Sequence, residues 1–311
     1  MRSILIKLPN WMGDILFSLD LLYTLSTYFD RIGVLTSKNH AELLTIFPVP
    51  RIEIITYSSD TWPNLDRDTI LQIEAFQPDA GLLLTNSIGS AMILRWAGVA
   101  DLYGYASERR GFLLKHSLPV PNYRLHQTAY YLELLKLFGL NPVAYPAPEQ
   151  GNRERLVIVH PGASRPPRAW HLDRFRSVAE QLSQNGFEVL FVSQHEIRDV
   201  PFRILRNPSL AEFASTLKRC SLFLGNDSGP LHLAQQCGAP VVGIYGPGTP
   251  ITTGPRPISP HKIVYHAFPC SPCRQRFFKE CNPAPSQKPY CIETISVDEV
   301  LHACFGLISC T

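Results

Sequence analysis

The sequence predicts an α/β protein with two doubly wound domains, and three observations support this fold class. Apolar runs of strand length alternate with helix-like segments along most of the chain. These runs are apolar at consecutive positions, which is typical of parallel strands buried on both faces. The chain has 311 residues, whereas one domain usually has roughly 100–200. The alternation therefore has room to build two helix-covered parallel sheets.

The first half of the chain contains four strand-to-helix units followed by one more helix. The predicted strands are residues 3–8, 31–36, 51–57 and 79–85. The helices that follow them are residues 14–28, 39–47, 69–76 and 87–98, and the further helix is 126–138. Short strands that alternate with helices in this way indicate a parallel sheet covered on both sides.

Residues 140–155 separate the two predicted domains. They are rich in Pro and polar residues, which break helices and suit an exposed connection. We place one domain over residues 1–150 and a second over residues 151–311. The same pattern then restarts, with strands at 155–162, 187–193, 221–227 and 239–247 and helices at 173–185, 209–219, from 229 onward and at 297–306.

The composition argues against a nucleic-acid-binding or membrane-spanning protein. Lys and Arg number 29 against 26 Asp and Glu, a formal charge of +3 that is too even to steer nucleic acid or a membrane surface. The N-terminus enters a strand directly, without an apolar signal core, and no apolar run has the length of a membrane span. We expect a soluble cytoplasmic protein. In such a chain the eight Cys favour free thiols or metal ligation over disulfides.

The segment LFLGNDSGPLHLAQQCG carries small and polar residues where an apolar strand passes into a helix. Backbone N–H groups at such a turn point beyond the strand end, where the helix dipole favours an anion. Gly229 would allow a phosphate to approach, Ser228 would add a hydroxyl donor and Asp227 would orient neighbouring groups. The alternative is that Asp227 and Ser228 cap the helix, with His232 as a satisfied interior histidine.

A second polar turn, HPGASRPPRAW, follows the strand at 155–162. Small residues followed by Arg165 and Arg168 would suit a diphosphate, because the guanidinium fork matches phosphate oxygens. The alternative is a solvated loop, although Trp170 is hard to explain as an exposed residue.

A third polar turn, LPNWMGDILF, joins the first strand to the first helix. Asp14, after Gly13, would project into the crevice that faces the second domain. The alternative is an ordinary N-cap aspartate. The functional interpretation gains support because three strand-to-helix turns carry polar groups, and in two stacked α/β domains all three can face one cleft.

These motifs resemble a known family. In their order and separation, LPNWMGDILFSLDLLYTL, HPGASRPPRAW and GNDSGPLHLAQQCGAPVVGIYGP are similar to the bacterial heptosyltransferases of glycosyltransferase family nine, which build the lipopolysaccharide inner core. The similarity includes residues 102–140 and 270–300 and so covers essentially the whole chain. It implies the GT-B fold, two Rossmann-like domains facing across a cleft, with the acceptor held mainly by the first and the nucleotide sugar mainly by the second.

The resemblance also implies a reaction. An ADP-heptose donor would give its sugar to an inner-core acceptor with inversion and without a metal or other catalytic cofactor. Asp14 matches the general base, which takes the proton of the acceptor hydroxyl as that oxygen attacks the anomeric carbon and ADP leaves from the opposite side. General-base help supplies about 10²- to 10⁴-fold, which suits a carboxylate in this role.

The same resemblance assigns binding residues. Arg168 stands where the family often has Lys before an aromatic residue. The positive charge is kept, but a planar guanidinium replaces an ammonium group. Glu196 follows a strand, at a position where the family often has an acidic residue that binds the donor sugar or the ribose. The small residues that usually lead up to this position are absent here. The implied donor-binding residues are Ser164, Arg168, Glu196, Asp227, Ser228, Gly229, Leu231 and His232. The acceptor should be anionic, and the candidates to bind it are Gly13, Arg109, Arg110 and Arg124.

Four cysteines near the C-terminus form a candidate structural metal site. Cys270 and Cys273 make a CxxC pair, and Cys281 and Cys291 follow at spacings that a loop could fold into one tetrahedral site for zinc or iron. Four Cys ligands would leave no open position for catalysis. Heptosyltransferase II-like members have a similar tail, and some related protein heptosyltransferases hold iron in such a site. The alternative is four free or redox-paired thiols. Cys220 and Cys237 are expected in the core.

Two other functions stay open. One is a family member that uses another nucleotide sugar or a protein acceptor, and the other is a nucleotide-sugar-binding or scaffold protein without activity. A dinucleotide oxidoreductase is disfavoured because no GxGxxG follows the first strand. A lipid-linked acceptor would place the protein at the inner face of the cytoplasmic membrane, and peripheral contact with that membrane is left open.

Overall fold

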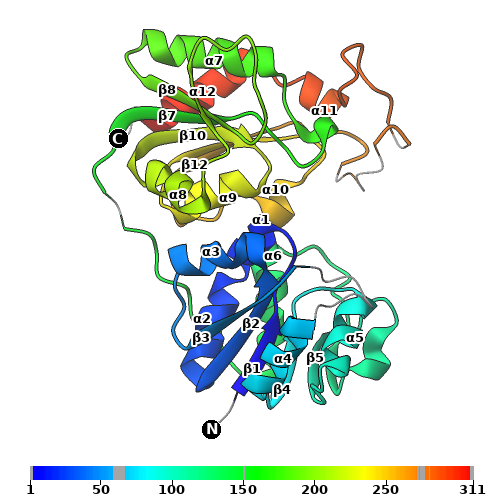
Figure 1. Ribbon diagram of the computed structural model, residues 1–311. Helices are drawn as coiled ribbons and strands as arrows, with labels where there is room; N and C mark the ends of the chain where they lie inside the picture. The colour runs from blue at the N-terminus through cyan, green and yellow to red at the C-terminus, as the bar shows by residue number, and fades with distance from the viewer. Residues whose placement is uncertain are drawn as a thin grey trace. The chain divides into compact units, whose positions relative to one another are not determined.

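The computed structural model describes residues 3–58, 67–149, 151–271, 273, 277–279 and 281–308. The chain divides into two compact units, Met1–Pro146 and Ala147–Thr311. Each unit contains a six-stranded parallel sheet with helices packed against it (Figure 1). The doubly wound fold expected for each half of the chain is therefore confirmed.

The first sheet has the strand order β3-β2-β1-β4-β5-β6. The strands are β1 (Ser3–Lys7), β2 (Arg31–Ser37), β3 (Ile52–Tyr57), β4 (Ala80–Leu83), β5 (Leu102–Tyr105) and β6 (His116–Leu118). The helices are α1 (Met12–Phe17), α2 (Leu19–Tyr28), α3 (Lys38–Ile46), α4 (Arg67–Phe76), α5 (Ile88–Trp96) and α6 (Gln127–Leu132), with 3-10 turns η1 (Arg110–Leu113) and η2 (Glu133–Phe138). Every residue of β1 is buried, as expected for a central parallel strand.

The second sheet repeats this topology with the order β12-β11-β10-β7-β8-β9. Its strands are β7 (Glu154–His160), β8 (Glu188–Ser193), β9 (Arg203–Arg206), β10 (Cys220–Asn226), β11 (Val241–Tyr245) and β12 (His261–Tyr265). Its helices are α7 (Leu172–Gln184), α8 (Leu210–Arg219), α9 (Gly229–Gln236), α10 (Pro250–Thr253), α11 (Tyr290–Glu293) and α12 (Val297–Ile308), with the 3-10 turn η3 (Pro166–Arg168). A core that includes Trp170, Phe175 and Phe191 lies between α7, α12 and the sheet.

All eight predicted strands are present, but four further strands were missed. These are β5, β6, β9 and β12. They are short, and β6, β9 and β12 end their sheets, where one side of a strand lacks a partner and the apolar signal is weak. The single helix predicted over 14–28 is also wrong, because it is divided into α1 and α2 at Ser18. The helix predicted at 126–138 continues from α6 into 3-10 geometry.

Each sheet has a point where the strand order reverses, between β1 and β4 in the first and between β7 and β10 in the second. Open α/β sheets bind ligands beyond the carboxyl ends of their strands at this switch point. The three polar turns singled out in the sequence follow β1, β7 and β10. The topology therefore places all three at switch points.

No described helix combines the length and the apolar character that a bilayer crossing needs.

Candidate functional site

The two polar turns of the second unit start side by side. Gly225 of β10 pairs with His160 of β7, so both strands end together. Asn226 then links the turns, because its Nδ2 donates to the carbonyl oxygens of Pro161 (2.8 Å) and Gly162 (3.2 Å) and its Oδ1 accepts the Trp170 N–H (2.9 Å). Sequence reasoning missed Asn226, although a buried amide at the end of an apolar strand was a usable signal.

Arg168 and Asp227 form an ion pair at this point. The Arg168 Nη2 donates to Asp227 Oδ2 (2.6 Å) and to the Asp227 carbonyl oxygen (3.0 Å). The Thr253 hydroxyl donates to the other carboxylate oxygen at 3.2 Å. Burial raises the pKa of Asp227, and the Arg168 charge and the Thr253 hydroxyl act against that rise. The Asp227 side chain is 6% exposed and that of Arg168 18%, so the guanidinium is the member of the pair that a ligand can reach.

The helix-capping alternative fails for both polar residues of this turn. Ser228 stands at the N-cap of α9, but its side chain makes no capping hydrogen bond and instead donates to the Asn226 carbonyl oxygen (3.2 Å). The carboxylate of Asp227 faces Arg168 and Thr253. The side chains of Asp227 and Ser228 therefore do not cap the start of α9.

The loop after β11 approaches the pair closely. A β-carbon added to Gly248 would lie 1.9 Å from Asp227 Oδ2, which no real contact allows. A glycine is thus required where this loop passes the carboxylate.

This close approach predicts a destabilised Gly248→Ala variant. The added methyl group must displace the Asp227 carboxylate, and overpacking of this kind typically lowers the free energy of unfolding by about 1–3 kcal/mol. Gly306→Ala is the matched control, because Gly306 is exposed in α12 and its β-carbon would meet no atom within 4 Å. That control should raise stability by about 0.5–1 kcal/mol. Urea denaturation of both variants measures the difference, and equal midpoints would contradict it.

The other predicted donor-binding residues occupy different settings. His232 is buried, with Nε2 3.9 Å from Asp227 Oδ1. Leu231 is fully buried, and a β-carbon on Gly243 would lie 2.9 Å from its Cδ2, so its side chain belongs to the core. Ser164 is exposed before η3. Glu196 is exposed after β8, with Oε2 3.5 Å from Arg198 Nη2. The structure thus gathers Arg168, Asp227, Ser228 and His232, while Glu196 pairs on a separate loop.

Asp14 lies in the first turn of α1 in the first unit. The helix begins at Met12 after the N-cap residue Trp11, so the N-cap alternative for Asp14 is wrong. The residue is partly exposed. Burial raises the pKa of Tyr131 well above its usual value, and the charge of Asp14 adds to this rise.

A buried lysine supports the loop before Asp14. The Lys7 side chain is 1% exposed, and its Nζ donates to the Leu8 carbonyl oxygen (3.2 Å), to Asn10 Oδ1 (3.1 Å) and to the Tyr57 hydroxyl (2.8 Å). These bonds fix the chain where it leaves β1. Sequence reasoning missed Lys7, although a lysine at the end of the apolar run SILIK was its signal.

The three predicted acceptor arginines differ in exposure. Arg109 and Arg124 are exposed, and Arg109 has the left-handed backbone angle φ 60°. Arg110 is fully buried, with Nε donating to the Tyr105 carbonyl oxygen (2.9 Å) and Nη1 to that of Ser87 (3.0 Å). Burial lowers its pKa to about 10. Arg110 therefore joins the end of β5 to the start of α5, and this buried setting does not suit the contact with an anionic acceptor for which it was a candidate.

The four clustered cysteines lie near one another. Burial raises the pKa of Cys291 to about 12, and the nearby Cys270, Cys273 and Cys281 contribute to this rise. Within the described residues, however, no group of three or more His, Cys, Asp or Glu side chains is arranged to hold a metal ion. The expected tetrahedral set is not assembled there. Cys220 and Cys237 are buried in the core, as expected.

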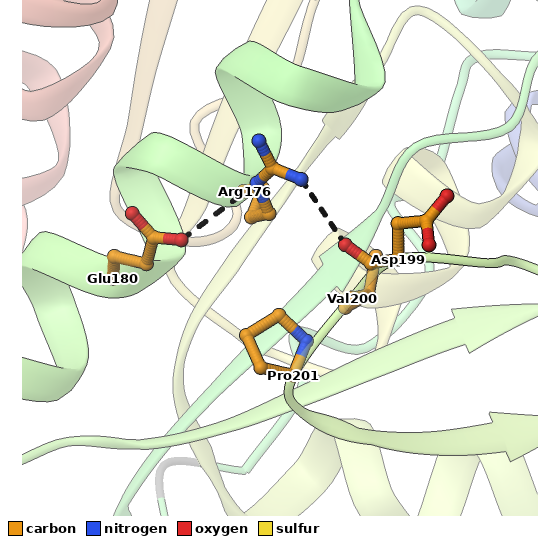
Figure 2. A pocket seen from close by; sticks show the side chains of 5 residues that line it. All are labelled: Arg176, Glu180, Asp199, Val200 and Pro201. Atoms are coloured by element: carbon orange, nitrogen blue, oxygen red, sulfur yellow. Dashed lines mark hydrogen bonds and ion pairs between the residues drawn. The ribbon is translucent and has the colours of Figure 1, made fainter.

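A surface pocket in the second unit lies between α7 and residues 199–201 (Figure 2). The Arg176 Nη1 donates to the Asp199 carbonyl oxygen (3.2 Å), and its Nε lies 3.7 Å from Glu180 Oε1. The remaining lining residues are Val200 and Pro201. Arg176 and Glu180 pair with each other, and the pocket contains no predicted site residue, so we assign it no function.

Two doubly wound units of this topology, with polar turns at their switch points, have the fold of GT-B glycosyltransferases. Comparison with known proteins identifies the family: the model of Glycosyltransferase family 9 (heptosyltransferase) matches residues 70–282, more than half of the chain. The chain belongs to this family and is a glycosyltransferase.

Individual relatives are distant but match over nearly the whole chain. The sequence is 23% identical to lipooligosaccharide heptosyltransferase 2 of Campylobacter jejuni, over 98% of each chain. The structure is similar to that of the E. coli ADP-heptose lps heptosyltransferase II, with a TM-score of 0.77 and 19% identity over 99% of each chain. It is also similar to the iron-containing dodecameric glycosyltransferase TibC from enterotoxigenic E. coli, with a TM-score of 0.65 and 16% identity over 100% of this chain and 77% of TibC.

Proposed function

We propose that this glycosyltransferase moves heptose from ADP-heptose to an inner-core sugar of lipopolysaccharide, with inversion at the anomeric carbon. The observation that carries the proposal is the Arg168–Asp227 pair beside the start of α9, at the switch point of the second sheet. Family membership and the names of the relatives support a heptosyl donor and a lipopolysaccharide or lipooligosaccharide acceptor.

The donor diphosphate would bind where β7 and β10 end. The Asp227 N–H donates to the Ile244 carbonyl oxygen, the Leu231 N–H donates to that of Ser228, and Pro230 has no N–H. A diphosphate at this turn would therefore meet the amides of Ser228 and Gly229, with the helix dipole favouring its charge. The partly exposed Arg168 guanidinium would neutralise the departing ADP, and Asp227 would hold that guanidinium in place.

Asp14 would act as the general base from the first unit. Its carboxylate takes the proton of the acceptor hydroxyl while that oxygen forms a bond to the anomeric carbon. The bond from this carbon to the diphosphate oxygen breaks on the opposite face, and the electron pair leaves with ADP. One inversion follows from one displacement, and none of these steps uses a metal ion.

Calorimetric titration with ADP, ADP-heptose, UDP and GDP tests the donor. Selective binding of the two adenine nucleotides is the expected result. Preference for UDP or GDP would instead indicate another nucleotide sugar, and binding of none of them would contradict the proposed nucleotide-sugar site. A transfer assay with a lipopolysaccharide core acceptor and with protein acceptors separates the two acceptor classes.

The acceptor is proposed to bind the first unit at the inner face of the cytoplasmic membrane. Its anionic groups suit the exposed Arg109 and Arg124, and the partly exposed Gly13 lies beside the base. Glu196 and Ser164 are proposed to meet the donor from loops of the second unit.

A structural zinc or iron bound by Cys270, Cys273, Cys281 and Cys291 stays a prediction. The described residues do not assemble its ligand set, and the relative TibC is named as iron-containing. Elemental analysis of the purified chain beside Cys273→Ser tests it. One equivalent of metal that is lost in the variant would support the site, and metal-free protein with unchanged stability would contradict it.

A further inference from the structure

The segment that carries Cys291 lies against the loop that carries Arg168. Figure 1 shows α11 near the chain that leads into α7, although more than a hundred residues separate them in sequence. We propose that residues 286–295, defined here as the clamp, position the Arg168 loop for binding of the donor diphosphate, with Glu293 as the central positioning residue. This inference rests on the proposed function.

Glu293 joins the clamp to the end of the Arg168 loop. Its Oε2 lies 2.7 Å from His171 Nε2, and its Oε1 accepts a hydrogen bond from Arg174 Nη2 at 2.9 Å. The Ser286 hydroxyl also donates to this carboxylate. His171 is the N-cap residue of α7, three positions after Arg168. The carboxylate therefore fixes the point where the loop ends.

Backbone oxygens of the clamp add to this connection. The Arg174 Nη1 donates to the carbonyl oxygens of Glu293 (2.6 Å) and Ile295 (2.7 Å). The Trp170 indole N–H donates to the Ile295 carbonyl oxygen as well (3.1 Å). Trp170 is 2% exposed. The residues on the C-terminal side of Arg168 are thus held by several bonds to one short segment.

Lys288 contacts the loop on the other side of Arg168. Its Nζ donates to the Pro166 carbonyl oxygen at 2.9 Å. Pro166 begins the 3-10 turn η3, which has three residues and ends at Arg168. So short a turn supplies little stability of its own, because isolated helical turns are marginal. Contacts from the clamp therefore help to fix the backbone of the turn that carries Arg168.

The clamp also contacts the loop that passes Asp227. Ile292 is fully buried, and a β-carbon on Gly246 would lie 2.3 Å from its Cγ1. Gly246 belongs to the same loop as Gly248, which touches the Asp227 carboxylate. The clamp thus packs on the chain segments beside both members of the ion pair. A displaced clamp would loosen the diphosphate site without removing any group that touches the donor.

Glu293→Gln and Lys288→Met test the proposal, with Glu299→Gln as the matched control. Glu299 is a neighbouring carboxylate that accepts bonds from Ser296 and pairs with His266 at the start of α12. Calorimetry gives the ADP Kd, and transfer kinetics separate the donor KM from kcat. We expect each clamp variant to raise the ADP Kd and the donor KM by about tenfold, equivalent to about 1.4 kcal/mol of binding free energy. kcat at saturating donor and both constants of the control should change little.

Hydrogen exchange of residues 162–170 provides a second readout, and we expect faster exchange in Glu293→Gln than in Glu299→Gln. Clamp variants that bind ADP like the wild-type protein and lose only stability would overturn the clamp and leave the proposed function intact. A wild-type protein that bound no nucleotide would overturn both. These two failures are distinguished by the wild-type titration alone.

Discussion

Asp14→Asn is expected to lower kcat by about 10²- to 10⁴-fold, the range that general-base catalysis supplies, while ADP binding stays unchanged. The carboxamide keeps the shape of the side chain but cannot take the proton of the acceptor hydroxyl. Asp14 lies on α1 of the first unit, whereas the proposed diphosphate site is built from β7, β10 and α9 of the second. Steady-state transfer kinetics beside ADP calorimetry measure the two effects separately.

Asp68→Asn is the control for this substitution. Asp68 also lies in the first turn of a helix of the first unit and is exposed, so the same chemical change there should leave kcat and stability nearly unchanged. An Asp14→Asn enzyme that kept more than about a tenth of the wild-type kcat would show that another group accepts the proton.

Arg168→Ala is expected to weaken both donor binding and stability. The substitution leaves the Asp227 carboxylate buried without its ion-pair partner, and breaking a buried pair typically lowers the free energy of unfolding by about 3–5 kcal/mol. We expect about 3 kcal/mol, because the Arg168 side chain stays 18% exposed. The proposed diphosphate site loses its cation at the same time, so the ADP Kd should rise at least about tenfold. Urea denaturation and calorimetry measure the two quantities.

Two further variants show whether the effect is specific. Arg203→Ala removes the same charge from an exposed ion pair of the second unit. In that pair, Arg203 Nη1 lies 4.0 Å from Glu188 Oε1. An exposed pair contributes about 0–1 kcal/mol, so this control should be nearly neutral. Arg168→Lys keeps the charge without the guanidinium fork and should fall between wild type and Arg168→Ala. Equal stability and ADP affinity in Arg168→Ala and Arg203→Ala would contradict the account of the pair.

The sequence predicted the fold wherever burial is uniform. The runs SILIK of β1 and CSLFLGN of β10 are buried throughout and were recognised. The run RILR of β9 has charged ends and lies at a sheet edge, so it gave no comparable signal. Ser18 divided a helix that periodicity alone made continuous, because nothing local marks that break.

The sequence predicted individual residues of the candidate site but not which of them contact one another. Asp227 and Arg168 were singled out from turns that follow two strands, yet their contact joins residues 59 positions apart and depends on the sheet order. Arg110 was a candidate to bind the acceptor, but it is buried against two backbone acceptors that only the tertiary structure brings together. Glu293 was not singled out, since its role depends on contacts with a distant loop.

The most direct test of the central claim is mass and NMR analysis of the product formed from ADP-heptose and a heptose-deficient inner-core acceptor by the wild-type enzyme. The account predicts an acceptor that gains one heptose with inverted anomeric configuration and the release of an equimolar amount of ADP. Consumption of ADP-heptose without any gain by the acceptor, or a product that retains the donor configuration, would contradict it.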